Sequence, residues 1–554
     1  MVPNILHMFS LSLLLLHYKS WSKAELFTAI AQMEPLLETH KRIIDDLDDY
    51  IMKEEKRIAV LKSHLQLYKL EHEKAMEDIP NYLGNPINAF TLIKRLTTDL
   101  DDIDDSIKVG TEYIKNITMS HDDVKYPTLE DLAGAAQALT RLQTTYRLDV
   151  RDLAEGVLNG IVYSHPMSAA DCYELARAVY NLKDFKNAIA WSMEALRKYR
   201  DETDIEHTFT ESDIHEYIGF SYFLTGDVKS ALEWTHKLLE IDPNHPRARG
   251  NIPHYEKTIK EQEKQNKKKQ RGEVGEDSNT EELSEDMKNY ANERAKYQAL
   301  CRGEVAVPSD IAKRLSCRYL TEHHPFLRLA PIKVEQVYIK PDVYVFHEVI
   351  SDEEIGFIQE MALPRFKRAV VHDPKTGELV KAHYRISKSS WLHDSESEVI
   401  ARLSRRVADM TGLSMHSAEE LQVVNYGIGG HYEPHYDFAR KFENAFANFE
   451  GNRIATVLFY MSEVAQGGAT VFTELGLSVF PIKHAALFWM NLHPSGEGDM
   501  ATRHAACPVL RGSKWVCNKW LHQGGQELLK PCNLDYQEEG IIRNIPRGIP
   551  KTSR

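Results

Sequence analysis

Apolar residues near the start of the chain follow a helical period. Ile44, Ile51, Ile58 and Leu65 recur every seven residues, the spacing that buries one stripe of a helix against a second helix. Two arrangements fit this stripe: a helix packed on its own domain, or a coiled coil between two chains. We therefore predict a helical coiled-coil/dimerisation domain over residues 23–160.

The pattern changes to paired helices between residues 165 and 260. It predicts four helices joined by short turns, at Cys172–Tyr180, Phe185–Leu196, Glu211–Leu224 and Val228–Ile241. Such pairs resemble tetratricopeptide repeats, which form concave binding surfaces. Tyr217, Phe220 and Phe223 fall on one face of the third helix, where they either belong to the core or line a groove for an extended peptide.

The segment from about residue 257 to residue 299 contains almost no large apolar side chains and divides into a basic and then an acidic block. This composition is typical of a solvated linker or an exposed helix. We predict a charged linker and connecting segment over residues 261–332. The net charge of −14 over 554 residues argues against broad nucleic-acid binding, which depends on a positive surface.

Short runs rich in β-branched and aromatic residues replace the helical pattern from residue 333. The predicted strands are Val343–Phe346, Leu421–Tyr426, Ile454–Tyr460 and Ala485–Trp489, with helices at Glu353–Ala362 and Glu398–Met410. Many short strands in succession favour an antiparallel barrel or jelly roll with helices supporting one sheet. The predicted fold is multidomain: α-helical N-terminal and tetratricopeptide-like domains, then an α+β double-stranded β-helix (jelly-roll) domain over 333–530 and a tail over 531–554.

The first residues contain an apolar stretch, Met8–Leu16, which is too short to span a bilayer and is followed by small residues at Ser20 and Ser22. We predict a signal peptide over residues 1–22 and a soluble product in the secretory pathway. In that compartment Asn116, within Asn-Ile-Thr, is a candidate glycosylation site.

The cysteines show no metal-binding spacing. They are Cys172, Cys301, Cys317, Cys507, Cys517 and Cys532, and no two of them form a C-x-x-C pair. Because cysteines at moderate separation close loops in an oxidising compartment, we predict disulfides Cys301–Cys317 and Cys507–Cys532. Cys172 and Cys517 would then be free, although six cysteines allow many other pairings.

One segment combines a glycine-rich turn, Gly427–Gly430, with a His-x-Asp sequence, His435-Tyr436-Asp437. On an extended strand His435 and Asp437 point to the same face. An imidazole and a carboxylate are two of the three ligands in the facial triad of non-haem Fe(II). His-x-Asp alone is weak, because it also occurs at His121–Asp123 in loop-like sequence.

A second segment supplies the rest of a candidate site. His504, which lies 67 residues after Asp437, is the predicted third ligand, and Lys514 follows ten residues later. An ammonium inside a largely apolar barrel is costly unless an anion meets it, and a bound dicarboxylate could supply that anion. A zinc hydrolase could also use two His and one carboxylate, but it would not explain Lys514.

The stretches NYGIGGHYEPHYDF and TRHAACPVLRGSKWVCNKWLH resemble the 2-oxoglutarate-dependent prolyl 4-hydroxylase family, particularly its collagen-type alpha subunits. This resemblance covers essentially the mature chain. It implies that His435, Asp437 and His504 ligate Fe(II), that Lys514 pairs with the distal carboxylate of 2-oxoglutarate, and that Tyr426 contacts this cosubstrate. The implied reaction hydroxylates proline at C4 in collagen-like peptides with O2 and 2-oxoglutarate, releases succinate and CO2, and uses L-ascorbate to restore the iron.

The resemblance also implies a proline-rich peptide site in the middle domain. Its implied residues are Tyr180, Tyr217, Phe220, Arg247 and Asn251. Phe220, Phe223 and His254 stand where tyrosines are more usual in the family, so hydroxyl hydrogen bonds would be lost while stacking on proline is kept. Both predicted disulfides fit the family pattern.

A heterotetramer of two such chains with two protein disulfide isomerase subunits in the endoplasmic reticulum lumen is the assembly that the resemblance implies. The chain ends without a Lys-Asp-Glu-Leu-like signal, so retention by this partner is expected. Two other functions stay open: a 2-oxoglutarate hydroxylase that modifies a different peptide residue, and a catalytically silent peptide-binding or assembly subunit. Intact His435, Asp437, His504 and Lys514 weigh against silence.

Overall fold

The computed structural model describes residues 34–108, 129–270, 285–372, 379–381, 385–427, 429–441, 443, 446 and 449–532. The predicted signal peptide, the Asn116 sequon and residues 533–554 of the predicted tail lie outside this set. Contacts divide the chain into two units, Met1–Glu77 with Asp102–Thr118, and Asp78–Asp101 with Met119–Arg554.

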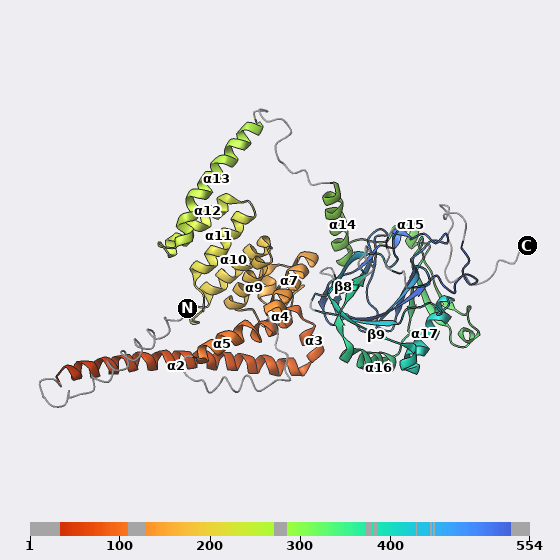
Figure 1. The fold of residues 1–554 in the computed structure, drawn as a ribbon, viewed down its shortest axis with the longest axis horizontal. Helices are drawn as coiled ribbons and strands as arrows, with labels where there is room; N and C mark the ends of the chain where they lie inside the picture. Colours follow the sequence, from red (N-terminus) through yellow and green to blue (C-terminus); the bar gives the residue numbers. More distant parts are fainter. Residues whose placement is uncertain are drawn as a thin grey trace, which may run out of the picture. The chain divides into compact units, whose positions relative to one another are not determined.

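Helix α2 (Glu34–Glu77) carries the predicted heptad stripe and is drawn in red in Figure 1. It runs for 44 residues without an internal glycine and with proline only in its first turn. Ile51, Ile58 and Leu65 are 44%, 43% and 53% exposed. The chain therefore leaves this part of the stripe accessible to solvent.

The second unit begins with short helices whose ends follow local capping rules. They are α3 (Ile79–Leu83), α4 (Pro86–Arg95), α5 (Thr98–Lys108, which crosses into the first unit), α7 (Leu129–Tyr146) and α8 (Val150–Ala154), followed by the hairpin β1 (Val157–Leu158) and β2 (Ile161–Val162). Pro86 stands at the first position of α4, and the Asn85 side chain accepts a hydrogen bond from the Ile87 amide at 2.9 Å. A proline at this position loses no helical hydrogen bond.

The four predicted repeat helices are confirmed. They are α9 (Ala169–Asn181), α10 (Phe185–Asp201), α11 (Glu211–Leu224) and α12 (Val228–Ile241), and α13 (Pro246–Gln270) follows them. Ser168 and Thr210 form capping boxes with Asp171 and Asp213 at the starts of α9 and α11, so the first backbone amides of each helix are satisfied.

The second half of the predicted linker and connecting segment, 261–332, contains a helix with a buried end. Helix α14 (Glu285–Cys301) buries Tyr297, Leu300 and Cys301 against the β-rich domain, and the Tyr297 hydroxyl donates to the Ala506 carbonyl at 3.3 Å. These buried residues occupy only the last turns of a helix whose first half is highly charged, so composition averaged over the segment concealed them. Strand β3 (Cys317–Leu320) also joins the main sheet before residue 333.

The β-rich domain contains two antiparallel sheets, as the jelly-roll prediction requires. The main sheet has the order β3-β4-β5-β16-β12-β19-β10-β9-β6, and the smaller sheet has the order β11-β17-β14-β15. The further strands of the main sheet are β4 (Ile332–Tyr338), β5 (Val343–His347), β6 (Lys367–Arg368), β9 (Ser387–Leu392), β10 (Leu421–Tyr426), β12 (Arg453–Tyr460), β16 (Ala486–Met490) and β19 (Trp515–His522). The smaller sheet contains β11 (Tyr432–His435), β14 (Thr470–Phe472), β15 (Leu477–Val479) and β17 (His504–Ala506).

Two further strand pairs lie outside these sheets, and short helices connect the strands. The pairs are β7 (Val370–His372) with β8 (Leu379–Lys381), and β13 (Gln466–Gly467) with β18 (Val509–Arg511). The helices are α15 (Ser309–Ala312), η4 (Pro325–Arg328), α16 (Asp352–Ala362), η5 (Leu363–Arg365), η6 (Asp394–Glu396), α17 (Glu398–Thr411) and η7 (Met500–Thr502).

Alternate residues of β12 belong to two different cores. Val457 and Phe459 pack in the cluster that contains the apolar faces of α16 and α17. Leu458 and Tyr460 pack in the cluster that also contains residues of β14 and β15 from the smaller sheet. The main sheet is therefore buried on both faces, between two helices and the second sheet, which explains why its central strands are apolar throughout. Figure 1 shows α16 and α17 along one side of the sheet.

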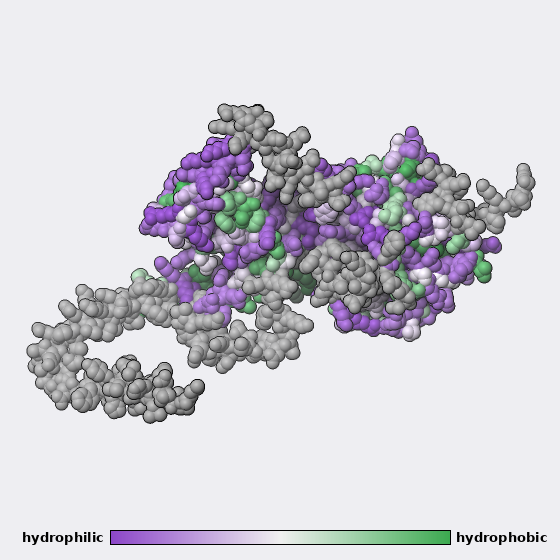
Figure 2. Space-filling view, turned by 45° about the horizontal axis from the view of Figure 1, so that its top comes forward, coloured by the Kyte–Doolittle hydropathy of each residue, from purple (hydrophilic) through white to green (hydrophobic). Residues whose placement is uncertain are grey.

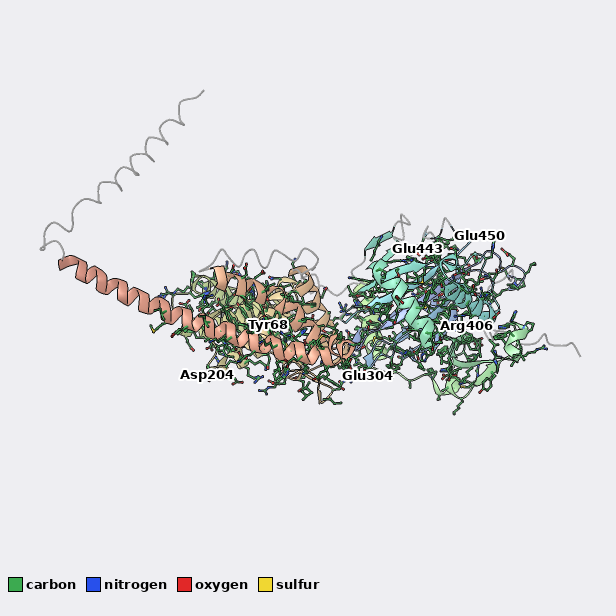
Figure 3. The ribbon with its side chains drawn as sticks, turned by 90° about the horizontal axis from the view of Figure 1, so that it is seen from below. Tyr68, Asp204, Glu304, Arg406, Glu443 and Glu450 are labelled. Atoms are coloured by element: carbon green, nitrogen blue, oxygen red, sulfur yellow. A yellow bond between two sulfur atoms is a disulfide. The ribbon has the colours of Figure 1, made fainter. Side chains whose placement is uncertain are left out.

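A buried carboxylate joins the two supporting helices. Glu354 on α16 accepts hydrogen bonds from Arg402 Nε at 3.1 Å and from Arg406 Nη1 at 2.8 Å, both on α17. Arg406, labelled in Figure 3, also donates to the Val349 carbonyl at 2.8 Å. Burial opposes the charged form of Glu354, but these two guanidinium groups hold its pKa below the usual range.

The surface agrees with the charged composition of the chain. The face shown in Figure 2 is mostly hydrophilic, with hydrophobic residues in small separate areas. Among the described helices, none carries an apolar stretch of the length needed to cross a bilayer.

Both predicted disulfides are wrong in the structure. Cys301 at the end of α14 is bonded to Cys507, which directly follows β17, with 5.5 Å between the two Cα atoms. Cys317 and Cys532 are free and exposed. Cys172 and Cys517 are free, as predicted, and the structure buries both. The prediction relied on sequence separation, but the packing of α14 on β17 brings together two cysteines that are 206 residues apart.

Peptide mapping without reduction should therefore link Cys301 to Cys507. We expect Cys301→Ser to lower the free energy of unfolding by about 2–4 kcal/mol, because the open chain regains the freedom of a long loop. Cys317→Ser is the matched control and should leave thermal unfolding unchanged. A native peptide that joins Cys301 to Cys317 would contradict this pairing.

Candidate active site

The pairing of two strands brings the predicted metal ligands together. His435 ends β11 and His504 begins β17, and the two residues are register partners in this antiparallel pair. Asp437 lies just beyond the end of β11. One potential ligand atom from each of His435, Asp437 and His504 lies within 4.8 Å of the other two. Strand pairing thus closes the gap between segments that are far apart in the sequence.

The donor atoms of this cluster are oriented for a metal ion. Nδ1 of His435 lies 2.8 Å from the Glu433 carbonyl, and Nδ1 of His504 lies 2.9 Å from the Thr502 carbonyl. Each Nδ1–H donates to its carbonyl, so each Nε2 keeps its lone pair. Both Nε2 atoms lie 3.6 Å from a carboxylate oxygen of Asp437. The residues present therefore fit the two-histidine, one-carboxylate set that binds Fe(II).

Burial sets the ionisation of this cluster. It lowers the pKa of His504 to about 4, so the imidazole is neutral at neutral pH. Burial opposes the charged form of Asp437 as well, but His504 and His435 hold the pKa of this carboxyl well below its usual range. Neutral imidazole and ionised carboxylate are the forms that bind metals.

Two residues that the sequence analysis missed hold the carboxylate of Asp437. Thr456 Oγ1 on β12 donates to Oδ2 at 2.8 Å, and Trp520 Nε1 on β19 donates to the same oxygen at 3.0 Å. Oδ1 has neither of these hydrogen bonds and lies 3.6 Å from His435 Nε2. Both donors stand on strands of the main sheet, and only knowledge of which strand positions point inward could have identified them.

Lys514 is buried at the end of the same barrel. The residue is 1% exposed. Its Nζ donates to the Gly468 carbonyl at 2.6 Å and lies 5.0 Å from the centre of the Tyr426 ring. Burial lowers the pKa of Lys514 to about 7. Among the described residues no carboxylate pairs with Lys514, so an anionic ligand would meet a lysine without a carboxylate partner.

Tyr426 lies beside this lysine, as the resemblance implies for a residue of the same site. Its backbone amide donates to the Lys514 carbonyl at 3.1 Å. Burial raises the pKa of Tyr426 to about 12, so its hydroxyl is protonated and available as a hydrogen-bond donor.

The predicted peptide residues lie on the repeat helices in two aromatic groups. The Tyr180 and Tyr217 rings are 5.0 Å apart and edge to face. Phe220 and Phe223 are 5.9 Å apart, and Phe223 stacks on Tyr255 at 4.9 Å. Tyr255 on α13 is buried in the core, so it supports Phe223 from behind rather than offering a surface to a ligand.

The two polar residues predicted for the peptide site differ in their contacts. Arg247 Nε lies 2.7 Å from a carboxylate oxygen of Glu216, so its guanidinium is oriented by an ion pair. Asn251 is half-buried on α13. Arg247 is 74% exposed in its side chain and is accessible to a ligand.

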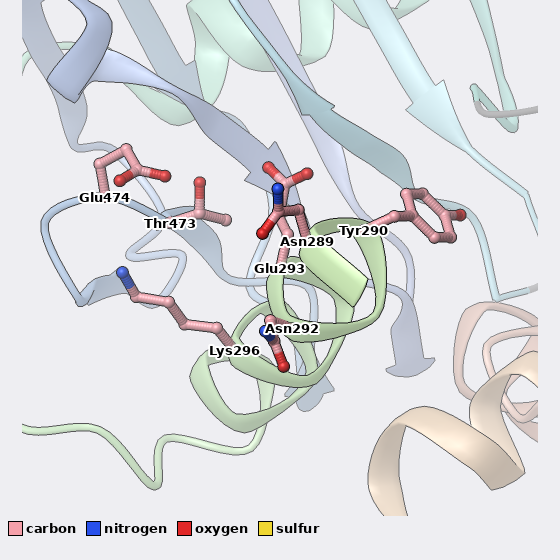
Figure 4. A pocket seen from close by; sticks show the side chains of 7 residues that line it. All are labelled: Asn289, Tyr290, Asn292, Glu293, Lys296, Thr473 and Glu474. Atoms are coloured by element: carbon pink, nitrogen blue, oxygen red, sulfur yellow. The ribbon is translucent and has the colours of Figure 1, made fainter. Parts of the chain in front are cut away.

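A cleft of about 530 Å³ lies between α14 and the turn after β14. Its lining residues, drawn in Figure 4, are Asn289, Tyr290, Asn292, Glu293, Lys296, Thr473 and Glu474. Glu293 accepts a hydrogen bond from Arg503 Nη2 at 3.2 Å, and the Arg503 guanidinium lies 5.2 Å from the Tyr436 ring. Because Arg503 directly precedes His504, α14 contributes to the surroundings of the metal cluster.

Three family models match consecutive parts of the chain. Residues 29–160 match the N-terminal region of the prolyl 4-hydroxylase alpha subunit, residues 169–261 match the prolyl 4-hydroxylase peptide-substrate-binding domain, and residues 421–522 match the 2OG-Fe(II) oxygenase superfamily. Prolyl 4-hydroxylase subunit alpha-1 of Caenorhabditis elegans is 45% identical, with 98% of each chain covered. The chain belongs to the prolyl 4-hydroxylase alpha-subunit family.

Vertebrate members of this family are similar over nearly the same length. Subunit alpha-1 of Gallus gallus is 44% identical, covering 93% of this chain and 100% of that protein, and subunit alpha-1 of Homo sapiens is 43% identical, covering 92% and 96%. A prolyl 4-hydroxylase with an oxygenase domain uses Fe(II), 2-oxoglutarate and O2, and the residues of the cluster fit this requirement.

The pKa of Lys514 predicts how the affinity for 2-oxoglutarate depends on pH. The resemblance implies that the dicarboxylate binds the protonated form of Lys514, whose pKa without ligand is about 7. The apparent Kd should therefore be lowest below pH 7 and rise about tenfold per pH unit well above it. Calorimetry on the anaerobic, metal-loaded protein measures this dependence, with Lys514→Met as the control that removes it. A wild-type Kd that is constant from about pH 6 to about pH 9 would contradict the assignment.

Proposed function

We propose that this chain is the catalytic alpha subunit of a procollagen-proline 4-dioxygenase. It hydroxylates proline at C4 in collagen-like peptides with O2 and 2-oxoglutarate and releases succinate and CO2. The observation that carries this proposal is the convergence of His435, Asp437 and His504, together with a buried Lys514 that has no carboxylate partner in the described part of the same domain.

Each of these residues has a distinct part in the proposed reaction. The Nε2 atoms of His435 and His504 and a carboxylate oxygen of Asp437 would hold Fe(II), and Lys514 would pair with the distal carboxylate of 2-oxoglutarate. Iron and 2-oxoglutarate, when bound, supply the oxidising chemistry, while the protein orients the reactants and excludes water. Tyr426, with its protonated hydroxyl beside Lys514, is suited to donate a hydrogen bond to the same carboxylate.

The repeat helices α9–α13 would hold the peptide. The edge-to-face pair of Tyr180 and Tyr217 offers faces on which proline rings stack, and Arg247 is exposed beside them on α13. Phe220 adds an apolar surface without a hydroxyl. Asn251 could donate to and accept from the peptide backbone.

The assembly and location follow the family expectation. The observed Cys301–Cys507 bond is of the kind that persists in an oxidising compartment such as the endoplasmic reticulum lumen. The exposed stripe of Ile51, Ile58 and Leu65 on α2 suits association with a second copy of the chain. We propose an α2β2 assembly with protein disulfide isomerase subunits, and Asn116 as a glycosylation site.

An intact site argues against a silent assembly subunit. A silent subunit needs neither two imidazoles oriented toward one carboxylate nor a buried lysine. Burying these ionisable groups costs stability when no ligand compensates them. A hydroxylase that acts on another residue would use the same iron site, so the target residue decides between the two enzymes.

Activity with a Pro-Pro-Gly repeat peptide tests the proposal. The wild type should release labelled CO2 from 2-oxoglutarate and form 4-hydroxyproline in equal amounts. Asp437→Asn and His504→Ala should each reduce both rates by more than about 100-fold, because each removes a metal ligand. His416→Ala, an exposed histidine of the same domain, should retain full activity. Peptide-dependent CO2 release without hydroxyproline would indicate another target residue, and no turnover by folded wild type would contradict the proposal.

A further inference from the structure

Helix α7 contacts the glycine turn that leads to the metal cluster. Arg141 on α7 donates from Nε at 3.2 Å and from Nη2 at 3.0 Å to the carbonyl of Gly429. Gly429 has a φ of +52°, and a Cβ there would lie 3.1 Å from the Ala138 carbonyl and 3.1 Å from Leu142 Cγ. The backbone of this turn therefore lies so close to α7, in a conformation with positive φ, that the position favours glycine.

A second contact lies behind Lys514. The Tyr146 hydroxyl at the end of α7 donates to the Pro508 carbonyl at 2.5 Å. The Gly468 amide donates to the same carbonyl at 3.1 Å, and the Gly468 carbonyl accepts from Lys514 Nζ at 2.6 Å. A Cβ on Gly467 would lie 2.6 Å from the Tyr146 hydroxyl. The Pro508 carbonyl thus links Tyr146 to Gly468, and the carbonyl of Gly468 accepts the hydrogen bond from Lys514.

A third contact lies just before Lys514 in the sequence. The Gly512 amide donates to the Gly84 carbonyl, between α3 and α4, at 2.8 Å. A Cβ on Gly84 would lie 2.6 Å from Gly512 Cα. Arg511 Nη1 donates to Asn81 Oδ1 at 2.7 Å. The helical region therefore touches each of the backbone segments that precede His435 and Lys514.

These contacts are part of a packed core. Leu510 of β18 is 3% exposed and belongs to the same apolar cluster as Leu139 of α7 and Trp191 of α10. Trp191 Nε1 donates to Gln143 Oε1 on α7 at 3.0 Å. The repeat helices, α7 and the strand that follows Pro508 thus share one continuous core, which holds their spacing fixed.

We infer that α7 is an integral part of the 2-oxoglutarate site and that Arg141 and Tyr146 are positioning residues for it. Arg141 fixes the turn at Gly429, and Tyr146 fixes the Gly467–Gly468 backbone whose carbonyl orients Lys514. This inference rests on the proposed role of Lys514 as the anchor of 2-oxoglutarate.

The chemistry of the two side chains suits this role. A guanidinium that donates twice to one carbonyl restricts the carbonyl in both position and direction. Burial raises the pKa of Tyr146, so its phenol stays protonated and donates to Pro508 throughout the physiological range. Neither side chain reaches the reacting atoms, so their effect passes through backbone groups.

Two conservative variants test the inference in the full chain with its partner subunits. Tyr146→Phe removes one hydroxyl and keeps the ring, and Arg141→Met removes the donors and keeps the stem. Each should raise the KM for 2-oxoglutarate by about 5- to 10-fold, the loss expected for one hydrogen bond, with kcat changed less. Hydrogen exchange in the metal-free protein should become faster at residues 429–430 and 466–470 only. Gln137→Ala, at an exposed position on α7, should change neither the KM for 2-oxoglutarate nor the hydrogen exchange.

Lys514→Met separates this inference from the proposed function. If it binds 2-oxoglutarate as tightly as the wild type, the proposed anchor fails, and the inference fails with it. If Lys514→Met loses affinity while Tyr146→Phe and Arg141→Met keep the wild-type KM and local exchange, the inference alone is overturned. Faster exchange throughout the β-rich domain in both variants would show a general structural role and would also overturn it.

Discussion

The antiparallel pairing of β11 with β17 places His435 opposite His504, and the proposed chemistry depends on this pairing. It sets the spacing of the two imidazoles, while carbonyl groups two residues before each of them orient the rings. Asp437 completes the cluster because it follows the end of β11 and is held by Thr456 and by Trp520. A shift of the register by one residue would turn one imidazole to the opposite face of the sheet.

Local sequence was sufficient to predict the repeat helices, four strands of the main sheet and the three residues of the metal cluster. The helices of the repeats follow from apolar periodicity and capping residues such as Ser168 and Thr210. The two-residue spacing of His435 and Asp437 indicated a shared face, and the segment around His504 supplied a third ligand. These features are local or belong to short motifs, so they could be recognised without knowing how distant segments pack.

Features that depend on tertiary packing were missed. The Cys301–Cys507 bond requires α14 to lie on β17, and the sequence around α14 is dominated by its charged first half. Thr456 and Trp520 both reach Asp437 because the register of β12 and β19 in the main sheet places them opposite each other. Arg141 and Tyr146 lie more than 280 residues from the groups they contact, a separation over which sequence pattern carries no pairing information.

The binding of iron is the most direct test of the central claim. Fe(II) is titrated into the anaerobic protein by calorimetry, with and without 2-oxoglutarate, and bound iron is counted after dialysis. We expect one saturable site per chain, tighter binding in the presence of 2-oxoglutarate, and loss of the site in His504→Ala. A wild-type protein without a saturable site, or a site that persists unchanged in His504→Ala, would contradict the account.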